Sequence, residues 1–144
     1  MTRLLIGALL ALAWVGPARA DGRALVVQVP TEPPGLDLTA SPASAIAAVV
    51  HYNVQECLVK VDRHGAIVPW LAERWEVSRD TLTYTFRLKR GVRFHNGREL
   101  KATDVKFVLE RAANPETTHP YVRRYQNIAA IRAVDDHTVA VGLA

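Results

Sequence analysis

The sequence predicts a mixed α+β fold built on antiparallel hairpins, and three observations support this prediction. Apolar and polar residues alternate along 75–77 and 82–88, as they do in strands with one buried and one solvated face. Asp and Gly between such segments, for example at 62–65, favour tight turns. Two other segments, 41–58 and 103–112, repeat their apolar residues with helical spacing. The combination indicates an α+β domain built from local hairpins.

The first 20 residues have the features of an export signal. Arg3 precedes an apolar run from Leu4 to Val15, and the small-residue site Ala18-Arg19-Ala20 follows it. These 12 apolar residues, rising about 1.5 Å each, are too short to cross a membrane core about 30 Å thick. We therefore expect cleavage after Ala20, a periplasmic location, and no membrane anchor. No cysteine follows the cleavage site for lipid attachment.

A short buried strand is expected next, at 24–29, where an apolar and β-branched run stops at Pro30. Pro33, Pro34 and Gly35 then favour an extended, turning loop. Rigid loops that follow strands often carry binding residues. This loop is therefore a candidate for function.

A helix is expected over 41–58. Its apolar residues, from Ile46 to Leu58, follow helical spacing, and Ser41-Pro42 supplies an N-cap followed by a first-turn proline. Cys57 lies on the apolar side of this pattern, which favours a small core residue over a nucleophile. Because it is the one cysteine of the chain, no disulfide can form within these residues.

The rest of the chain alternates between short periodic segments and turns. Asn96-Gly97 and Asp135-Asp136 mark turns by their residue types. The expected elements are, in order, strands at 58–61 and 66–68, a helical turn at 69–73, strands at 75–77 and 82–88, a helix at 103–112, and strands at 128–134 and 138–143.

Composition and motifs exclude several classes of function. Once Arg3 and Arg19 are removed with the signal, 16 basic and 14 acidic residues leave a net charge of +2, too small to indicate nucleic-acid binding. The densest basic run, 87–93, alternates like a strand, so its charges are expected on a solvated face. The sequence has no Gly-x-Ser-x-Gly, phosphate-loop or His-Glu-x-x-His motif, and its five histidines lack metal-ligand spacing. We expect no enzyme activity, no cofactor and no bound metal.

Five motifs occur in order over nearly the whole chain after the signal segment. They are PGLD at 34–37, NVQECLV at 53–59, DRHG at 62–65 with PWLAERWEVS at 69–78, LTYTFRLKRGVRFHNG at 82–97, and ATDVKFVLER at 102–111. Their order and content resemble the start of the extracellular solute-binding proteins of family 5, the dipeptide, oligopeptide and nickel binders. Each motif alone is weak evidence, but five in the same order are strong.

Three positions depart from the family pattern. Leu38 stands where the family commonly has Pro, and Cys57 where it usually has Gly. Lys101 stands where the family often has a Thr that caps the following helix. The sequence therefore predicts that Thr103 caps this helix instead, or that its first turn frays.

The resemblance implies an α/β fold of the periplasmic-binding-protein type II class, a two-lobed clamp that closes on its ligand about a hinge. It also implies a division of this chain: a signal peptide at 1–20, the first strand and cleft loop of lobe I at 21–40, and the small additional antiparallel-sheet domain, incomplete, at 41–144. The second lobe, which in the family carries most groups that fix peptide termini, would be absent.

The function implied is that of the receptor subunit of a bacterial ABC importer, a monomer that captures peptides in the periplasm and delivers them to permease subunits at the inner membrane. Thr31, Glu32 and Pro33 resemble the family segment that lines the cleft, where an extended peptide can add as a short strand. Glu32 would meet the amino group or a backbone N–H of the peptide, or else is a solvated loop acid.

Other functions stay open at this stage. The same fold can take nickel, haem, an opine or an oligosaccharide, because the fold does not choose the ligand. A stand-alone secreted interaction module is the rival of another class. In either case we expect the 144-residue chain by itself not to bind a ligand tightly, because one wall cannot exclude water from a cleft.

Overall fold

The computed structural model describes residues 27–51, 53–116 and 119–144. The predicted signal peptide and its cleavage site lie outside these residues. The elements of the described part are α1 (Ser44–Val50), β1 (Val59–Val61), β2 (Ile67–Pro69), β3 (Ala72–Val77), β4 (Thr83–Leu88), α2 (Ala102–Ala113), the 3₁₀ helix η1 (Val122–Tyr125), β5 (Ile128–Asp135) and β6 (Thr138–Leu143).

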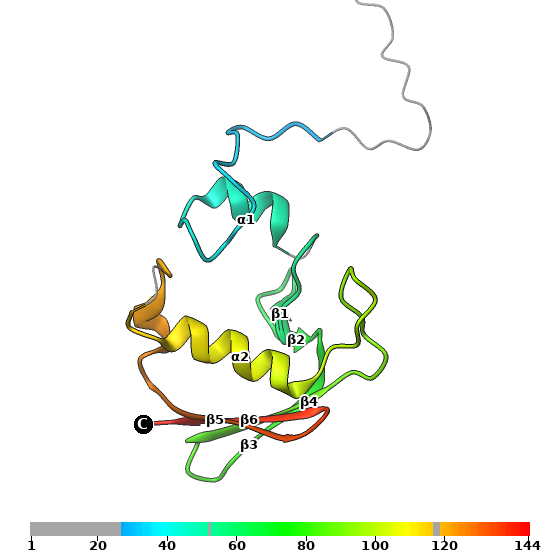
Figure 1. Cartoon of the computed structure of the whole chain (residues 1–144), viewed down its shortest axis with the longest axis vertical. Coiled ribbons are helices and arrows are strands. Elements are labelled where there is room, and N and C mark those ends of the chain that lie inside the picture. The colour runs from blue at the N-terminus through cyan, green and yellow to red at the C-terminus, as the bar shows by residue number, and fades with distance from the viewer. Residues whose placement is uncertain (1–26, 52, 117–118) are drawn as a thin grey trace, which may run out of the picture.

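The strands form two antiparallel sheets, as the hairpin patterns predict. β1 pairs with β2, and the larger sheet has the order β3-β4-β6-β5, so that β6 is inserted between β4 and β5. Figure 1 shows α2 lying across one face of the larger sheet, with α1 on the far side of α2. The mixed α+β architecture predicted from the sequence is confirmed.

The alternation in β4 decides which side chains meet α2. Phe86 and Leu88 contribute to the core beneath the helix, and Phe86 is paired with Val139 of β6. Because successive side chains of a strand point to opposite faces, Thr85 and Arg87 lie on the other face of the sheet. The alternation of apolar and polar residues along the hairpin therefore predicts which face of the sheet is buried.

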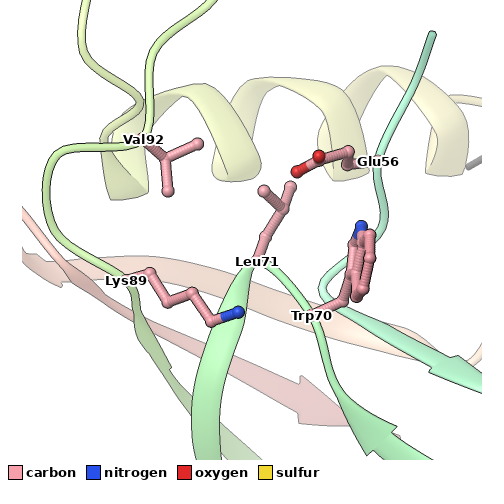
Figure 2. A pocket seen from close by; sticks show the side chains of 5 residues that line it. All are labelled: Glu56, Trp70, Leu71, Lys89 and Val92. Carbon is pink, nitrogen blue, oxygen red and sulfur yellow. The ribbon is translucent and has the colours of Figure 1, made fainter. Parts of the chain in front are cut away.

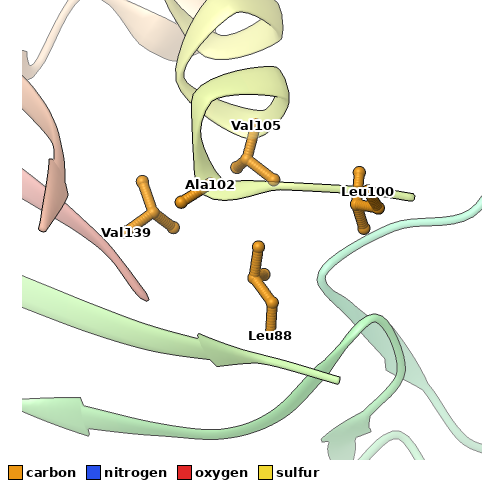
Figure 3. Packing of buried hydrophobic residues seen from close by; sticks show 5 residues of the cluster. All are labelled: Leu88, Leu100, Ala102, Val105 and Val139. Carbon is orange, nitrogen blue, oxygen red and sulfur yellow. The ribbon is translucent and has the colours of Figure 1, made fainter. Parts of the chain in front are cut away.

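The core lies between α2 and the larger sheet (Figure 3). It contains one residue of β4, one of β6, the start of α2 and the residue that precedes this helix by two positions. These residues are Leu88, Leu100, Ala102, Val105 and Val139. They come from segments far apart in sequence. Their packing joins α2 to β4, which precedes it in the chain, and to β6, which follows it.

The helix expected over 41–58 is much shorter, and this prediction is wrong in extent. α1 covers only Ser44–Val50. At its end the Asn53 Nδ2 donates to the carbonyl of Val49 at 3.1 Å, and the backbone N–H groups of Val54 and Gln55 both point to the Val50 carbonyl. The side chain of Asn53 competes for a helix carbonyl and turns the chain.

The helical turn expected at 69–73 is also wrong, because Pro69 and residues 72–73 belong to strands and Trp70 and Leu71 form the bend between them. Pro69 ends β2 and Ala72 begins β3. The N–H groups of Leu71 and Ala72 donate to the carbonyls of Cys57 and Leu58, at 3.1 and 2.9 Å. These bonds to a distant segment hold the backbone extended, and no local pattern reveals them.

α2 begins at Ala102, and neither Thr103 capping nor fraying is observed. The Asp104 carboxylate accepts the Lys101 N–H at 2.9 Å and a two-point bond from Arg98 at 2.9 and 2.8 Å. A lysine side chain cannot accept a hydrogen bond, so this is the acid half of a capping box. The start of α2 is therefore held by Asp104 in place of a side-chain cap at position 101.

The buried strand expected at 24–29 falls partly outside the described residues. Its described part, 27–29, forms no strand, and Val27 is 67% exposed. A strand is held by hydrogen bonds to a neighbouring strand. None of the described strands pairs with this segment.

Candidate functional site

The predicted cleft loop lies at the N-terminal end of the described chain. Thr31 and Glu32 are exposed and Pro33 is half-buried. Within the part of the chain that the structure describes, the Glu32 carboxylate has no hydrogen-bond or ion-pair partner. The loop therefore presents a free carboxylate on a segment in which prolines 30, 33 and 34 restrict the backbone.

After the cleft loop, the Asp37 side chain accepts hydrogen bonds that stabilise a turn before α1. The backbone N–H and the hydroxyl of Thr39 both donate to Asp37 Oδ1 at 2.7 Å. These hydrogen bonds lower the pKa of the Asp37 carboxyl, and the charges of Arg111 and His119 lower it further. The carboxylate therefore lies within electrostatic reach of α2 and of the segment before η1.

An aromatic cluster lies near the segment between the cleft loop and α1, and the sequence analysis did not single it out. The ring of His119 meets Tyr125 edge to face at 5.5 Å and Tyr121 at 6.2 Å between ring centres. The Arg124 guanidinium lies 4.4 Å from the centre of the Tyr121 ring, which is partly exposed. We call His119, Tyr121, Arg124 and Tyr125 the η1 aromatic cluster.

One contact joins the η1 aromatic cluster to the segment that follows the cleft loop. The Tyr121 hydroxyl donates to the Pro42 carbonyl, just before α1, at 3.3 Å. Two aromatic residues spaced four apart in 119–125 were the available sequence signal, since such residues share a face of a helical turn. The Asn-Pro and His-Pro pairs that precede η1 indicated a loop instead.

Cys57 is half-buried, and its surroundings do not activate it. Its Sγ lies 3.5 Å from His51 Nε2, and burial raises the pKa of the thiol. A thiol that stays protonated is a poor nucleophile. Among the described residues no group of three or more His, Cys, Asp or Glu side chains is placed to hold a metal ion.

The basic run at 87–93 does not form one continuous surface track. Arg87 is half-buried, donates to the Thr138 hydroxyl at 2.7 Å and lies 3.8 Å from Asp135, while Lys89 and Arg90 are exposed. Arg87 therefore ties β4 to the start of β6. No described helix is long and apolar enough to cross a membrane.

The comparison that decides the family involves the sheet and α2. Residues 66–144, more than half of the chain, match the family described as "Bacterial extracellular solute-binding proteins, family 5 Middle". The chain belongs to this family. The sequence motifs, the hairpins of the structure and this match thus agree on the same family.

Relatives within the family match at moderate identity. Glutathione-binding protein GsiB of Salmonella choleraesuis is 41% identical over 98 residues, which are 68% of this chain and 19% of that protein. Di/tripeptide-binding protein 1 of Pseudomonas aeruginosa is 38% identical over an alignment of 102 residues, and the match covers 57% of this chain and 19% of that protein. The chain thus spans about a fifth of the length of these relatives.

A solved structure also matches the fold. AgaA of "A.tumefacien R10", in complex with agropinic acid, superimposes with a TM-score of 0.72 at 33% identity, over 78% of this chain and 22% of AgaA. The predicted α/β fold class is confirmed, since such structural neighbours are binding proteins of the periplasmic type II class.

Proposed function

We propose that the chain is part of a non-enzymatic receptor subunit of a bacterial ABC importer, which captures peptides in the periplasm and delivers them to permease subunits. Membership of the solute-binding family is the observation that carries this proposal. The names of two relatives, for di/tripeptides and for glutathione, favour short peptides as the ligand class. The predicted signal peptide at 1–20 agrees with export.

In this proposal Thr31, Glu32 and Pro33 form one wall of the ligand cleft. Glu32 is exposed and without an ion-pair partner among the described residues, so its carboxylate is available to the ammonium group of a peptide. The proline-restricted backbone loses little entropy when an extended peptide lies beside it. The exposed Tyr121 ring of the η1 aromatic cluster contacts Pro42, between the cleft loop and α1.

The test is thermal denaturation of the protein encoded by the complete reading frame, with a library of di-, tri- and oligopeptides. A ligand that binds only the folded state raises the Tm, so peptides of the right class should raise it by several degrees. Glu32→Gln should weaken binding by about five- to tenfold through loss of a charged hydrogen bond. Glu76→Gln, an exposed acid on β3, is the matched control.

Two results would contradict the proposal. A Tm that stays flat across the library far above micromolar concentration excludes peptides, and agropinic acid is then the next ligand to try because of the likeness to AgaA. A micromolar Kd of the 144-residue chain alone for a peptide, weakened by Glu32→Gln, would contradict the expectation that one wall of the cleft does not bind tightly by itself. Turnover in a hydrolase screen would contradict the non-enzymatic assignment.

A further inference from the structure

A second candidate site lies between the small hairpin and the loop after β4. It is a pocket of about 300 Å³ lined by Glu56, Trp70, Leu71, Lys89 and Val92. None of these residues belongs to the cleft loop at 31–33 or to the η1 aromatic cluster. The pocket is therefore distinct from the residues proposed for the cleft.

Backbone hydrogen bonds hold the walls of this pocket in place. The Leu71 N–H donates to the Cys57 carbonyl at 3.1 Å, and the Lys89 N–H donates to the Leu71 carbonyl at 2.9 Å. The Leu100 N–H donates to the Val92 carbonyl at 2.8 Å, which joins the loop at 89–92 to the segment before α2. Three segments distant in sequence, 56–57, 70–71 and 89–92, thus surround one opening.

The pocket carries two opposite charges on either side of an apolar floor. Figure 2 shows the Glu56 carboxylate and the Lys89 ammonium group on opposite sides of Leu71, with the Trp70 ring forming one wall. Glu56 and Lys89 are exposed, while Trp70, Leu71 and Val92 are half-buried. Among the described residues Glu56 has no ion-pair partner.

Two lysine ammonium groups lie near the indole ring of Trp70, which lines this pocket. Lys89 Nζ lies 5.8 Å from the centre of the Trp70 ring, and Lys60 Nζ lies 3.6 Å from it. An ammonium group near an aromatic face is attracted by the quadrupole of the ring. The exposed Lys89 ammonium group therefore lies near the Trp70 ring at the edge of the pocket.

We propose that this pocket binds a small zwitterion with an apolar side chain, an α-amino acid or a dipeptide. Glu56 accepts hydrogen bonds from the ligand ammonium group, and Lys89 pairs with its carboxylate. Trp70, Leu71 and Val92 contact the ligand side chain. The volume is at the lower end of small-molecule sites, which limits the ligand to this size.

The experiment uses the full chain labelled with 5-fluorotryptophan and follows its ¹⁹F resonances during titration with L-leucine or Leu-Leu. The Trp70 signal, assigned by Trp70→Phe, should shift and saturate, while that of Trp75 on β3 should not. N-acetyl-leucine lacks the ammonium group and leucinamide lacks the carboxylate, so each should lose most of the shift. Whichever of leucine and Leu-Leu binds more tightly identifies the ligand size.

Variants separate the pocket from the cleft. Glu56→Gln and Lys89→Gln should each raise the Kd by about tenfold, and because both side chains are exposed, circular dichroism should show an unchanged fold. Glu76→Gln and Arg79→Gln, which alter exposed side chains outside both the pocket and the cleft loop, should leave this Kd unchanged. The absence of a saturable Trp70 shift at millimolar ligand, or equal shifts with leucinamide, would overturn the proposal, whatever the outcome for the cleft.

Discussion

Thr81 in the turn between β3 and β4 has a φ of 61°, in the left-handed region. A β-branched residue is unfavourable there, because its Cβ crowds the following carbonyl oxygen. The turn is nevertheless well bonded: the Thr81 N–H donates to the Ser78 carbonyl, and the Asp80 carboxylate accepts the Ser78 hydroxyl and the Leu82 N–H. These bonds offset the strain at one residue.

Replacing Thr81 should therefore stabilise the chain. Asn tolerates the left-handed conformation, so Thr81→Asn should raise the free energy of unfolding by about 1 kcal/mol in urea denaturation. Thr81→Val keeps the branched Cβ and loses the hydroxyl bond to the Asp80 carbonyl, so it should give no gain. A loss of stability in the Asn variant would show that the hydroxyl matters more than the backbone strain.

At the scale of elements, Asp104 connects α2 to the loop before it. The same carboxylate receives the Lys101 N–H and the Arg98 guanidinium. The hydrogen bond from Arg98 is the largest cause that lowers the pKa of Asp104. A negative charge in the first turn is also favoured by the helix dipole.

The substitution Asp104→Asn should lower the free energy of unfolding by about 1 to 2 kcal/mol, since it weakens both the helix start and the bond to Arg98. Glu110→Gln in the last half of α2 is the matched control. It removes an exposed pair with Lys106, which should cost about 0.5 kcal/mol or less. Equal losses for the two variants in urea denaturation would show that Asp104 has no special role at the helix start.

At the scale of the whole molecule, carboxylates tie the loops to the larger sheet. Glu99 accepts the Gly91 N–H at 2.9 Å and lies 3.5 Å from His137, and Lys101 bonds Asp136 at 2.7 Å. These contacts connect the loop before α2 to the turn between β5 and β6. The carboxyls whose pKa is lowered are those of Asp37, Asp80, Glu99, Asp104, Asp135 and Asp136.

Acid should therefore destabilise the fold. A carboxyl whose pKa is lower in the folded chain contributes stability above its unfolded pKa, about 4, and this is lost as the pH falls through the folded pKa. The Tm should be nearly constant from pH 7 to about 5 and fall steadily below about pH 4. Asp104→Asn should show a shallower fall, and a Tm independent of pH over this range would contradict the role of these carboxylates.

Sequence reasoning succeeded where the governing interactions are local. Tyr84, Phe86 and Leu88 alternate with polar residues, and turn residues bound each hairpin, so pairing between neighbouring strands was predictable. The insertion of β6 between β4 and β5 was not, because periodicity does not state which distant strands pair.

Where the prediction failed, a distant or competing contact governs the backbone. The Cys57 carbonyl holds Leu71 extended, and the Asn53 side chain takes the Val49 carbonyl at the end of α1. For the candidate site, Glu32 was identified through the family resemblance, whereas the bond between Tyr121 and Pro42 joins residues 79 positions apart. Patterns over short windows cannot reveal such a contact.

The central position of β6 has a consequence for synthesis on the ribosome. β6 is translated after the other described strands, yet both β4 and β5 depend on it for hydrogen-bond partners. Until Thr138–Leu143 emerges, the nascent chain presents two unpaired strand edges, which are templates for aggregation. Slow decoding before codon 138 should therefore increase the demand of this chain for chaperones.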